Sequence, residues 1–532
     1  MSPQLATSTS PTTSGPAQRF DVLVVGAGPA GLTTALGLAR HGVRVLVVEK
    51  HAGTSTFPKA SGIRPRTMEI FRGWGLESRV RAAGQDVRME VAISATLRVA
   101  VQAVEDLGVP DDDYLSRVSP SRFAFVPQDR LEPVLLDEVR VAGGEVRFRT
   151  ELSGFEVCED GVRAHLRPRD GDAPAYDVAA RYLVGADGAR SHVRRALGVP
   201  MRHLGSHGRH VAVLFTADLD RLMPGPSYAL RWVTTPGAEG LLVASGPGRW
   251  TFDWEVDAAA AEPSPEHAAR RIRAAAGAPD LPLEVLRIFP WDMAAELADA
   301  MRDGPVFLVG DAAHRTTPRG ATGMNTGIAA AHNLAWKLAW VLRGWAHDSL
   351  LDTYEDERRP VGRANTQASL RERGDLPVEP GAMDFGVTYD TAEPEPLEPP
   401  GRPGLAVVTG RRAPHAWIHL PGGRRLSTLD LFVGRLTLVT GPEHEEWSAA
   451  AAALTGPAPV TVVALGVDVP DPDGSTARLY GVASGGAVLV RPDGHVVWRT
   501  QEPGGYAALQ HAQDRVTGLT EGAEPADRAD VA

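Results

Sequence analysis

The stretch Asp21-Val-Leu-Val-Val25, followed at once by Gly26-Ala-Gly-Pro-Ala-Gly31, decides how the amino-terminal part of the chain folds. An apolar, β-branched run of this kind is typical of a strand that is buried on both faces. A helical stretch over 32–40 is closed by Gly42, and a second buried strand over 43–48 ends in Glu49. The order strand, helix, strand predicts a β-α-β unit of the α/β class.

The three glycines of this unit have separate physical roles. Gly26 allows a tight turn, Gly28 allows a pyrophosphate to approach the backbone, and Gly31 allows the helix to pack closely on the strand. The helix start directs free N–H groups and the positive end of its dipole at the phosphates. Glu49, 18 residues after Gly31, lies where a carboxylate accepts hydrogen bonds from a ribose. The alternative is a glycine-rich turn that binds no nucleotide. The predicted contacts are Gly26, Gly28, Pro29, Ala30, Gly31, Glu49 and Lys50.

Two later segments repeat the pattern of a buried strand that ends in an acidic turn. Residues 182–191 place Asp187 after a strand and before a helix over 193–197. Residues 306–314, Val-Phe-Leu-Val-Gly-Asp-Ala-Ala-His, place Asp311 in the same way. The glycine-rich sequence Pro-Arg-Gly-Ala-Thr-Gly-Met-Asn, 318–325, then leads into a long helix that starts at Thr326. We expect these turns and the first glycine turn to converge on one cofactor.

The composition excludes several classes of protein. A net charge of −11 disfavours nonspecific nucleic-acid binding, which requires a basic surface. Cys158 is the only cysteine, which excludes an intrachain disulfide and a CxxC pair and agrees with a cytoplasmic location. The sequence has no metal-binding motif, hydrolase elbow, second glycine fingerprint or apolar run of membrane-spanning length. We therefore predict no metal, no nucleic-acid partner and no membrane association.

Together the three segments resemble the class A flavoprotein monooxygenases, the aromatic hydroxylase family of para-hydroxybenzoate hydroxylase, phenol hydroxylases and polyketide-tailoring hydroxylases. The resemblance covers about residues 20–362, and it is specific because the three motifs occur in the family's order. It implies FAD as cofactor, NAD(P)H as a transient cosubstrate and O2 as the oxygen source. It further implies that a flavin C4a-hydroperoxide delivers one oxygen atom to an aromatic or polyketide-type small molecule, in secondary metabolism such as antibiotic biosynthesis.

The resemblance also implies roles for individual residues, although it names no catalytic base. Glu49 binds the ribose of the adenosine, Asp311 binds the ribityl chain, and Pro318 stands beside the flavin ring near the face that reacts with oxygen. The substrate pocket lies between the FAD-binding domain and a sheet over 200–290, where Trp291 either lines the pocket or packs in the core. The remaining implied contacts of the cofactor are Lys59, Gln128 and Asp187, with Gly323, Met324 and Asn325 at the flavin ring.

Several of these residues have an alternative interpretation that the sequence leaves open. Asp187 also fits a cap on the helix that follows it, and Asp311 fits an ordinary turn. Lys59 and Gln128 also fit solvated surface positions. His314 is interpreted as structural.

The chain departs from the family pattern at three places. Residues 320–323 read Gly-Ala-Thr-Gly, where Gly-Gly-Gln-Gly is common. Ala330 and Ala331 stand in a segment that usually contains Asp-Ala, so this chain lacks that acid. Lys59 occupies a position that is commonly arginine, and it presents a point charge rather than a fork of donors.

Alternating residues over 154–182 and 210–256 predict antiparallel strands, in which Trp232, Trp250, Phe252 and Trp254 are interpreted as packing residues, with a substrate-binding role as the alternative. Apolar segments within 410–499 predict a small α/β unit that resembles the thioredoxin-like tail of phenol and polyketide hydroxylases. Without cysteines this tail cannot exchange disulfides, so we expect a packing role or support of a homodimer.

The expected fold is α/β: a Rossmann-like FAD-binding domain with an inserted antiparallel β-sheet substrate domain, and a carboxy-terminal thioredoxin-like domain that lacks cysteines. Two alternatives to hydroxylation are Baeyer–Villiger insertion on the same fold and a non-catalytic flavin-containing ligand-binding protein. The expected division is a disordered leader (1–18), the first part of the FAD-binding domain (19–200, with a substrate-domain insertion near 86–120), the substrate-binding sheet (201–292), the second part of the FAD-binding domain (293–374), a linker (375–404) and the thioredoxin-like domain (405–520).

Overall fold

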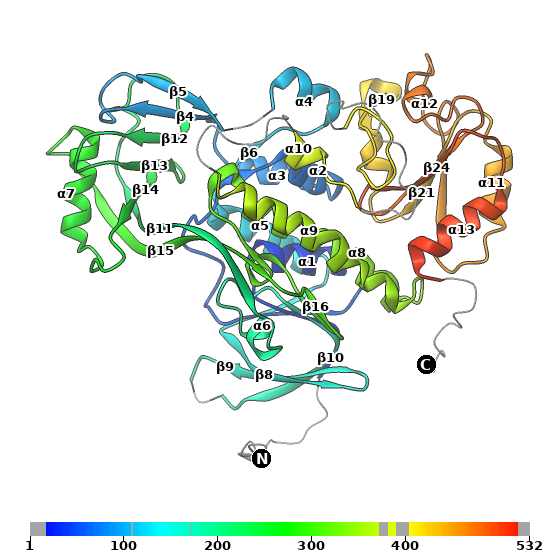
Figure 1. The fold of residues 1–532 in the computed structure, drawn as a ribbon, viewed down its shortest axis with the longest axis horizontal. Helices are drawn as coiled ribbons and strands as arrows, with labels where there is room; N and C mark the ends of the chain where they lie inside the picture. The colour runs from blue at the N-terminus through cyan, green and yellow to red at the C-terminus, as the bar shows by residue number, and fades with distance from the viewer. Residues whose placement is uncertain (1–17, 108–109, 172, 372–380, 390–403, 520–532) are drawn as a thin grey trace.

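Two large sheets and a carboxy-terminal unit make up the protein in the computed structural model (Figure 1). The structure describes residues 18–107, 110–171, 173–371, 381–389 and 404–519. The expected leader lies outside these residues apart from Gln18, which begins a strand. Most of the expected linker also lies outside them, but its residues 381–389 include a short helix, α10 (Ala382–Phe385).

The first sheet carries the glycine turn at the carboxyl end of its central strand, β1. Strands β17, β10, β1, β2 and β7 run parallel, as a β-α-β order predicts. Strand β16 pairs antiparallel with β17, and the antiparallel β8 and β9 continue from β10. The strands are β1 (Gln18–Val25), β2 (Val45–Glu49), β7 (Glu145–Phe148), β8 (Thr150–Cys158), β9 (Gly161–Pro168), β10 (Tyr176–Gly185), β16 (Arg302–Asp303) and β17 (Val306–Leu308).

Helices cover this sheet and complete the main core. The central helix α1 packs against both α5 and α8. It begins at Pro29 rather than at Leu32 as predicted, because proline fits the first turn of a helix. The long helix α8 begins at Gly323 rather than at Thr326. The helices of this part are α1 (Pro29–Arg40), α2 (Pro65–Gly73), α3 (Glu77–Ala82), α4 (Asp112–Val118), α5 (Gln128–Val141), α6 (His192–Ala196), α8 (Gly323–Leu342) and α9 (Thr353–Ala368).

The second sheet lies beside the first and is antiparallel except where β12 meets β4. Helix α7 (Pro265–Ala276) covers one of its faces. Trp250, Phe252 and Trp254 are buried in the core under this helix, which confirms their interpretation as packing residues. The strands, in spatial order, are β18 (His314–Arg315), β15 (Glu284–Ala298), β11 (Met201–Thr216), β14 (Arg249–Val256), β13 (Gly240–Ala244), β12 (Tyr228–Val233), β4 (Arg88–Ser94) and β5 (Ala103–Asp106). A short pair, β3 (Gly62–Ile63) and β6 (Ala124–Phe125), links the loop after β2 to the start of α5.

The carboxy-terminal unit is built on four strands in the order β22-β21-β23-β24. Strands β21 and β22 are parallel, whereas β23 and β24 are antiparallel to their neighbours. The apolar residues of α11 and α13 share a core with Trp336 and Trp340 of α8, so this unit packs against the first domain. Its elements are β19 (Trp417–His419), β20 (Arg425–Ser427), β21 (Leu436–Thr440), α11 (Glu445–Ala452), β22 (Val460–Ala464), α12 (Ser475–Leu479), β23 (Ala487–Val490), β24 (Val496–Thr500) and α13 (Tyr506–Thr517).

Two kinds of feature are absent from the described ranges. No helix among these residues is long and apolar enough to cross a bilayer. Acidic, histidine and cysteine side chains within the same ranges nowhere form a group of three or more that could hold a metal ion.

Candidate active site

The glycine turn after β1 is fixed by contacts that only glycine allows. Gly26 has a φ of +109°, and a Cβ at this position would lie 2.4 Å from the carbonyl oxygen of Ala186. A Cβ on Gly31 would lie 2.0 Å from the carbonyl oxygen of Gly26. At Gly28, by contrast, no atom of the described chain lies within 4 Å of a built Cβ. The first and third glycines therefore serve the fold, and the second faces open space that a phosphate can occupy.

Glu49 closes one side of this turn. Its Oε2 accepts a hydrogen bond of 2.9 Å from the backbone N–H of Ala27, and its Oε1 accepts one of 2.9 Å from the backbone N–H of His51. Lys50, the next residue, is exposed and lies toward β8. On that strand, the hydrogen bond from Arg167 lowers the pKa of Glu151, and the charge of Lys50 lowers it further by a smaller amount. The structure thus brings Glu49 to the turn and leaves Lys50 at its outer edge.

Gln128 and Lys59 lie beside a buried acid on α5. The Nε2 atom of Gln128 donates to Oε1 of Glu132 at 2.6 Å, and the backbone N–H of Ser55 donates to Oε2 at 2.5 Å. Burial raises the pKa of Glu132, although Gln128, Ser55 and the charge of Lys59 oppose the shift. Gln128 is therefore half-buried and engaged, whereas Lys59 is exposed on the loop before β3.

Asp311 lies in a concave part of the surface, which we call the cleft. Its side chain is accessible to solvent, yet the surrounding protein raises its pKa by desolvation, against the charges of Arg315 and Lys59. No donor among the described residues forms a hydrogen bond to its carboxylate. Since Lys59 acts on both Asp311 and Glu132, segments that are distant in the sequence converge at this cleft. A carboxylate free to accept hydrogen bonds is suited to a hydroxylated chain such as ribityl.

The loop from Pro318 to the start of α8 forms the far end of the cleft. Pro318 is exposed, and Ala321 adopts a φ of +52°, a left-handed conformation that is rare for a residue with a Cβ. Asn325 holds the loop in place: its Nδ2 donates to the carbonyl oxygens of Gly62 at 2.8 Å and Ala321 at 2.7 Å. Its Oδ1 accepts from the backbone N–H of Arg64 at 2.9 Å. The strained loop is thereby bound to β3.

The first turn of α8 provides free backbone donors at the same end. Gly323 leaves no room for a side chain, because a Cβ would lie 2.6 Å from Oγ1 of Thr316. Met324 is half-buried, and like Gly323 it belongs to the first turn, whose N–H groups have no partner within the helix. These N–H groups and the helix dipole favour negative charge at this point.

Asp187 forms the helix cap that the sequence left open as an alternative. Its Oδ2 accepts hydrogen bonds from the backbone N–H groups of His192 at 2.6 Å and Val193 at 3.1 Å, at the start of α6. Its Oδ1 is buried and has no partner within the described chain. One oxygen therefore serves the fold, and the other is buried without a hydrogen-bond partner in the described chain.

The face of the second sheet opposite α7 carries a polar cluster of which the sequence analysis named only Trp291. Nδ1 of His210 lies 2.8 Å from Oδ1 of Asp253, and Nε1 of Trp291 donates to Oδ2 of the same carboxylate at 2.8 Å. Burial lowers the pKa of His210, but the hydrogen bond to Asp253 and its charge raise the pKa by more. No motif marks these residues, because β11, β14 and β15 bring them together only through their pairing register.

Apolar residues surround this cluster and join it to the cleft. Ala212, Leu214 and Phe289 lie on the same sheet face, and Phe57 of the loop before β3 packs on Phe289 with ring centroids 5.2 Å apart. At the other end of β15, Arg315 bonds to Glu296 at 3.3 Å. The His210 cluster therefore lies between the two loops that frame the cleft.

Family models match almost all of the described chain. The FAD binding domain family matches residues 19–369, and the aromatic-ring hydroxylase C-terminal family matches residues 406–519. The chain belongs to the FAD-dependent aromatic-ring hydroxylases.

Relatives of this hydroxylase match it from end to end. It is 38% identical over 519 residues to the tetracenomycin B2 monooxygenase-dioxygenase of Streptomyces olivaceus, covering 90% of this chain and 95% of that one. It is 38% identical to the aklavinone 12-hydroxylase of Streptomyces purpurascens, covering 92% and 96%.

Solved structures agree with the fold of the hydroxylase. The ternary complex of aklavinone-11 hydroxylase with FAD and aklavinone has a TM-score of 0.84 at 37% identity, covering 94% of this chain and 99% of that one. The monooxygenase PieE in complex with FAD and substrate has a TM-score of 0.86 at 33% identity, covering 95% and 100%. The hydroxylase is therefore an FAD-dependent monooxygenase with a mixed α/β fold, which favours an enzyme over a non-catalytic flavin-containing protein.

Proposed function

We propose that this monooxygenase hydroxylates the aromatic ring of a polyketide-type compound in antibiotic biosynthesis. The relatives named for tetracenomycin and aklavinone support this substrate class. The observation that carries the proposal is the His210–Asp253 pair, a proton acceptor that lies beside Ala212, Leu214 and Phe289 on a sheet face next to the cleft. Such a face suits a planar, fused-ring molecule with a phenolic hydroxyl.

The cleft fits FAD by the chemistry of its residues. We infer that the turn of Gly26, Gly28 and Gly31, with Pro29 and Ala30, takes the pyrophosphate, since Gly28 leaves space for it. When bound, FAD supplies the redox chemistry: it takes a hydride from NAD(P)H and activates O2. The other proposed contacts are Glu49 and Lys50 near the ribose, Lys59, Gln128 and Asp187 along the nucleotide, Asp311 at the ribityl chain, and Pro318, Gly323, Met324 and Asn325 at the ring.

His210 has the setting of a general base. Because Nδ1 faces the Asp253 carboxylate, the proton of a neutral ring sits on Nδ1, and Nε2 remains an acceptor. Trp291 holds the second oxygen of Asp253 and so fixes the orientation of the pair. Removal of a phenolic proton by Nε2 makes the adjacent ring carbon more electron-rich, which favours hydroxylation over the Baeyer–Villiger alternative, where the oxygen attacks a ketone. The half-buried rings of Phe289 and Trp291 shield part of this face from water.

The carboxy-terminal unit and the assembly are secondary parts of the proposal. We infer a thioredoxin-like fold for this unit, supported by its strand order, its parallel pair β21 and β22 and its antiparallel pair β23 and β24. Cys158, the single cysteine, lies on β8 and not in this unit. A homodimer and a cytoplasmic location stay predictions, and sedimentation of the pure enzyme measures the first.

The test is a screen of phenolic polyketides for faster NAD(P)H oxidation coupled to a product that gains one oxygen atom. The proposal predicts such a compound, and it predicts that blocking its phenol as a methyl ether lowers turnover of the wild type strongly. If the ether is hydroxylated as fast as the phenol, His210 does not act as the proposed base.

A further inference from the structure

A second polar cavity, of about 60 Å³, lies behind Asn325, on the side of α8 that faces the carboxy-terminal unit. Its walls come from α2, α8, α9 and α10, and from the turn between β23 and β24. A single water needs about 10–15 Å³ of such space, so the cavity holds a small ion with some water and excludes an aromatic substrate. Arg64 and Asn325 form part of its wall and bind the carbonyl oxygens of Gly320 and Ala321, in the loop that precedes α8.

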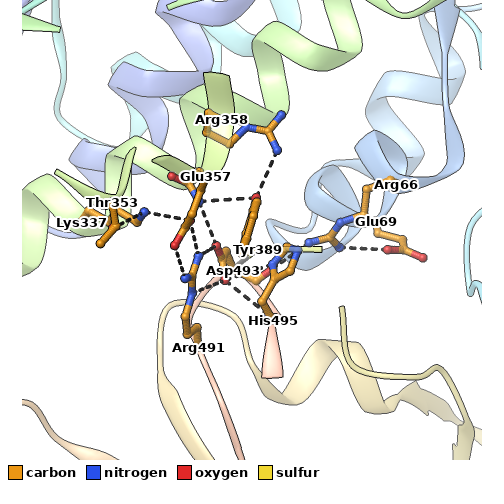
Figure 2. Close-up of polar contacts among 11 residues, drawn as sticks. Arg66, Glu69, Lys337, Thr353, Glu357, Arg358, Tyr389, Arg491, Asp493 and His495 are labelled. Atoms are coloured by element: carbon orange, nitrogen blue, oxygen red, sulfur yellow. Dashed lines mark hydrogen bonds and ion pairs between the residues drawn. The ribbon is translucent and has the colours of Figure 1, made fainter. Parts of the chain in front are cut away.

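Arg358, on α9, lines this cavity without a counter-charge. Its side chain is 3% exposed, and its Nη1 donates to the hydroxyl of Tyr389 at 3.1 Å. Its Nε has no partner, and no carboxylate of the described chain lies within ion-pairing distance. Figure 2 shows Arg358 reaching only Tyr389, whereas the adjacent Glu357 turns to Lys337 and Arg491.

The other buried cations near the cavity already use every carboxylate there. Glu357 accepts from both Lys337 at 2.8 Å and Arg491 at 2.5 Å, and Arg491 is also 2.6 Å from Asp493. Sharing of this kind leaves none of the described acids free for Arg358. Two further ion pairs use the other acids. Arg64 pairs with Asp384 at 2.7 Å. Glu69 is shared by Arg66 at 2.9 Å and Arg412 at 3.1 Å.

The described charges around the cavity therefore leave an excess of positive charge in a buried place. An uncompensated buried charge is strongly unfavourable, and proteins usually pair such a charge. Water alone solvates the guanidinium but does not balance its charge. The neighbouring His314 does not balance the charge either. Its ring is buried, and neither ring nitrogen has a partner in the described chain. Burial and the charge of Arg358 lower the pKa of His314 to about 4, so the ring is neutral.

The sequence contains a place for the missing acid. Contacts of Thr326 with Asn365, and of Asn333 with Glu357, set an antiparallel register between α8 and α9. This register places Ala330 opposite the turn of α9 that follows Arg358. An acidic side chain at position 330 would therefore lie on the face of α8 that meets α9, but the chain has alanine there.

We propose that the cavity beside Arg358 binds a small monovalent anion of the halide class, which supplies the counter-charge that Arg358 lacks among the described residues. The anion holds α9, α10 and the β23–β24 turn together through Arg358, Tyr389 and their neighbours. It is a structural ligand, separate from the oxygenation chemistry.

Thermal unfolding of the FAD-loaded enzyme tests the site, with sodium bromide replacing sodium gluconate at constant ionic strength. Bromide is expected to raise the Tm of the wild type saturably by about 2–5 °C. Arg358→Gln is expected to lose this response, and Arg163→Gln, an exposed control on β9, to keep it. Ala330→Asp is expected to unfold in gluconate at the Tm that the wild type reaches in bromide.

Two results overturn the proposal. One is a bromide response that is absent in the wild type or equal in Arg358→Gln. The other is a crystal grown in bromide whose anomalous density shows no ion within 4 Å of the Arg358 guanidinium. If Arg358→Gln does not fold, Ala330→Asp provides the test instead. An unchanged bromide response in Ala330→Asp also contradicts the proposed site.

Discussion

The cleft beside the glycine turn and the proposed substrate face, which is the side of the second sheet that carries His210, show two different ways in which a sequence specifies a site. In the cleft, a side chain at Gly26 would collide with the backbone just after β10, and a side chain at Gly31 would collide with the backbone of the turn itself. On the substrate face, His210 and Asp253 are 43 residues apart and meet only because β11 and β14 pair in one register. A site built from local backbone geometry is therefore visible as a motif, whereas a site built from side chains of paired strands is not.

The largest expected effect is at the glycine turn. Gly31→Ala places a Cβ 2.0 Å from a backbone oxygen that cannot move freely. We expect a loss of more than about 3 kcal/mol of stability, with protein that purifies without flavin. Flavin absorbance and the free energy of unfolding measure both. Gly53→Ala is the matched control, since no described atom lies within 4 Å of its Cβ, and equal losses in the two variants would contradict a backbone-built cleft.

The next effect is at the interface with the carboxy-terminal unit, which is also built from distant side chains. Burial raises the pKa of Glu357, but the charges of Arg491 and Lys337 outweigh it and lower the pKa to about 2. A carboxylate with a lowered pKa stabilises the fold above its ordinary pKa of 4.5, and this stability is lost as the pH falls from 4.5 toward 2.

Glu357→Gln is expected to cost about 3–5 kcal/mol at neutral pH, because it leaves the buried Lys337 without a carboxylate partner and leaves Arg491 with Asp493 alone. It should also flatten the acid dependence of the unfolding free energy, measured in denaturant between pH 7 and pH 3. The exposed Glu156→Gln serves as control. A variant with the wild-type acid dependence would show that Glu357 does not carry this stability.

Much of the fold could be predicted from the sequence, and parts of the site could not. The strands before Gly26 and Gly310 and the long helix after Asn325 were predicted, because apolar runs and glycine turns are local signals. The cap formed by Asp187 was an alternative that hydrogen-bond geometry alone could decide. The His210 cluster depends on strand register, and the position of Arg358, which has no carboxylate partner among the described residues, depends on helix packing. A single sequence reveals neither.

A third variant sharpens the comparison on the substrate face. His210→Gln removes the proton acceptor while it keeps a polar side chain, so we expect kcat to fall about 100-fold with a small change in KM. Because the pKa of His210 is raised, the wild-type rate should decline as the pH falls through a value above 6.5, and the variant should lack this limb. His203→Gln, exposed on the same strand, should behave as the wild type. If the rate of His210→Gln still declines at low pH, the decline is caused by another titrating group.

The smallest effect is expected from a single polar contact in the cleft. Asp311→Asn keeps the size of the side chain but removes the charge that accepts hydroxyl hydrogen bonds. We expect the Kd of FAD to rise about 10-fold, measured by fluorescence titration of apoprotein. Asp303→Asn, an exposed acid on β16, should leave the Kd unchanged. An unchanged Kd in Asp311→Asn would remove Asp311 from the cofactor site.

The most direct test of the whole account follows the oxygen atom. Purified enzyme is supplied with NAD(P)H, labelled 18O2 and a phenolic polyketide from the screen, and the product is analysed by mass spectrometry and NMR. The account predicts one 18O atom on a ring carbon next to the phenol, with FAD bound and NAD(P)H consumed. Label that comes from water, or an oxygen inserted between a carbonyl and its neighbouring carbon, would contradict it.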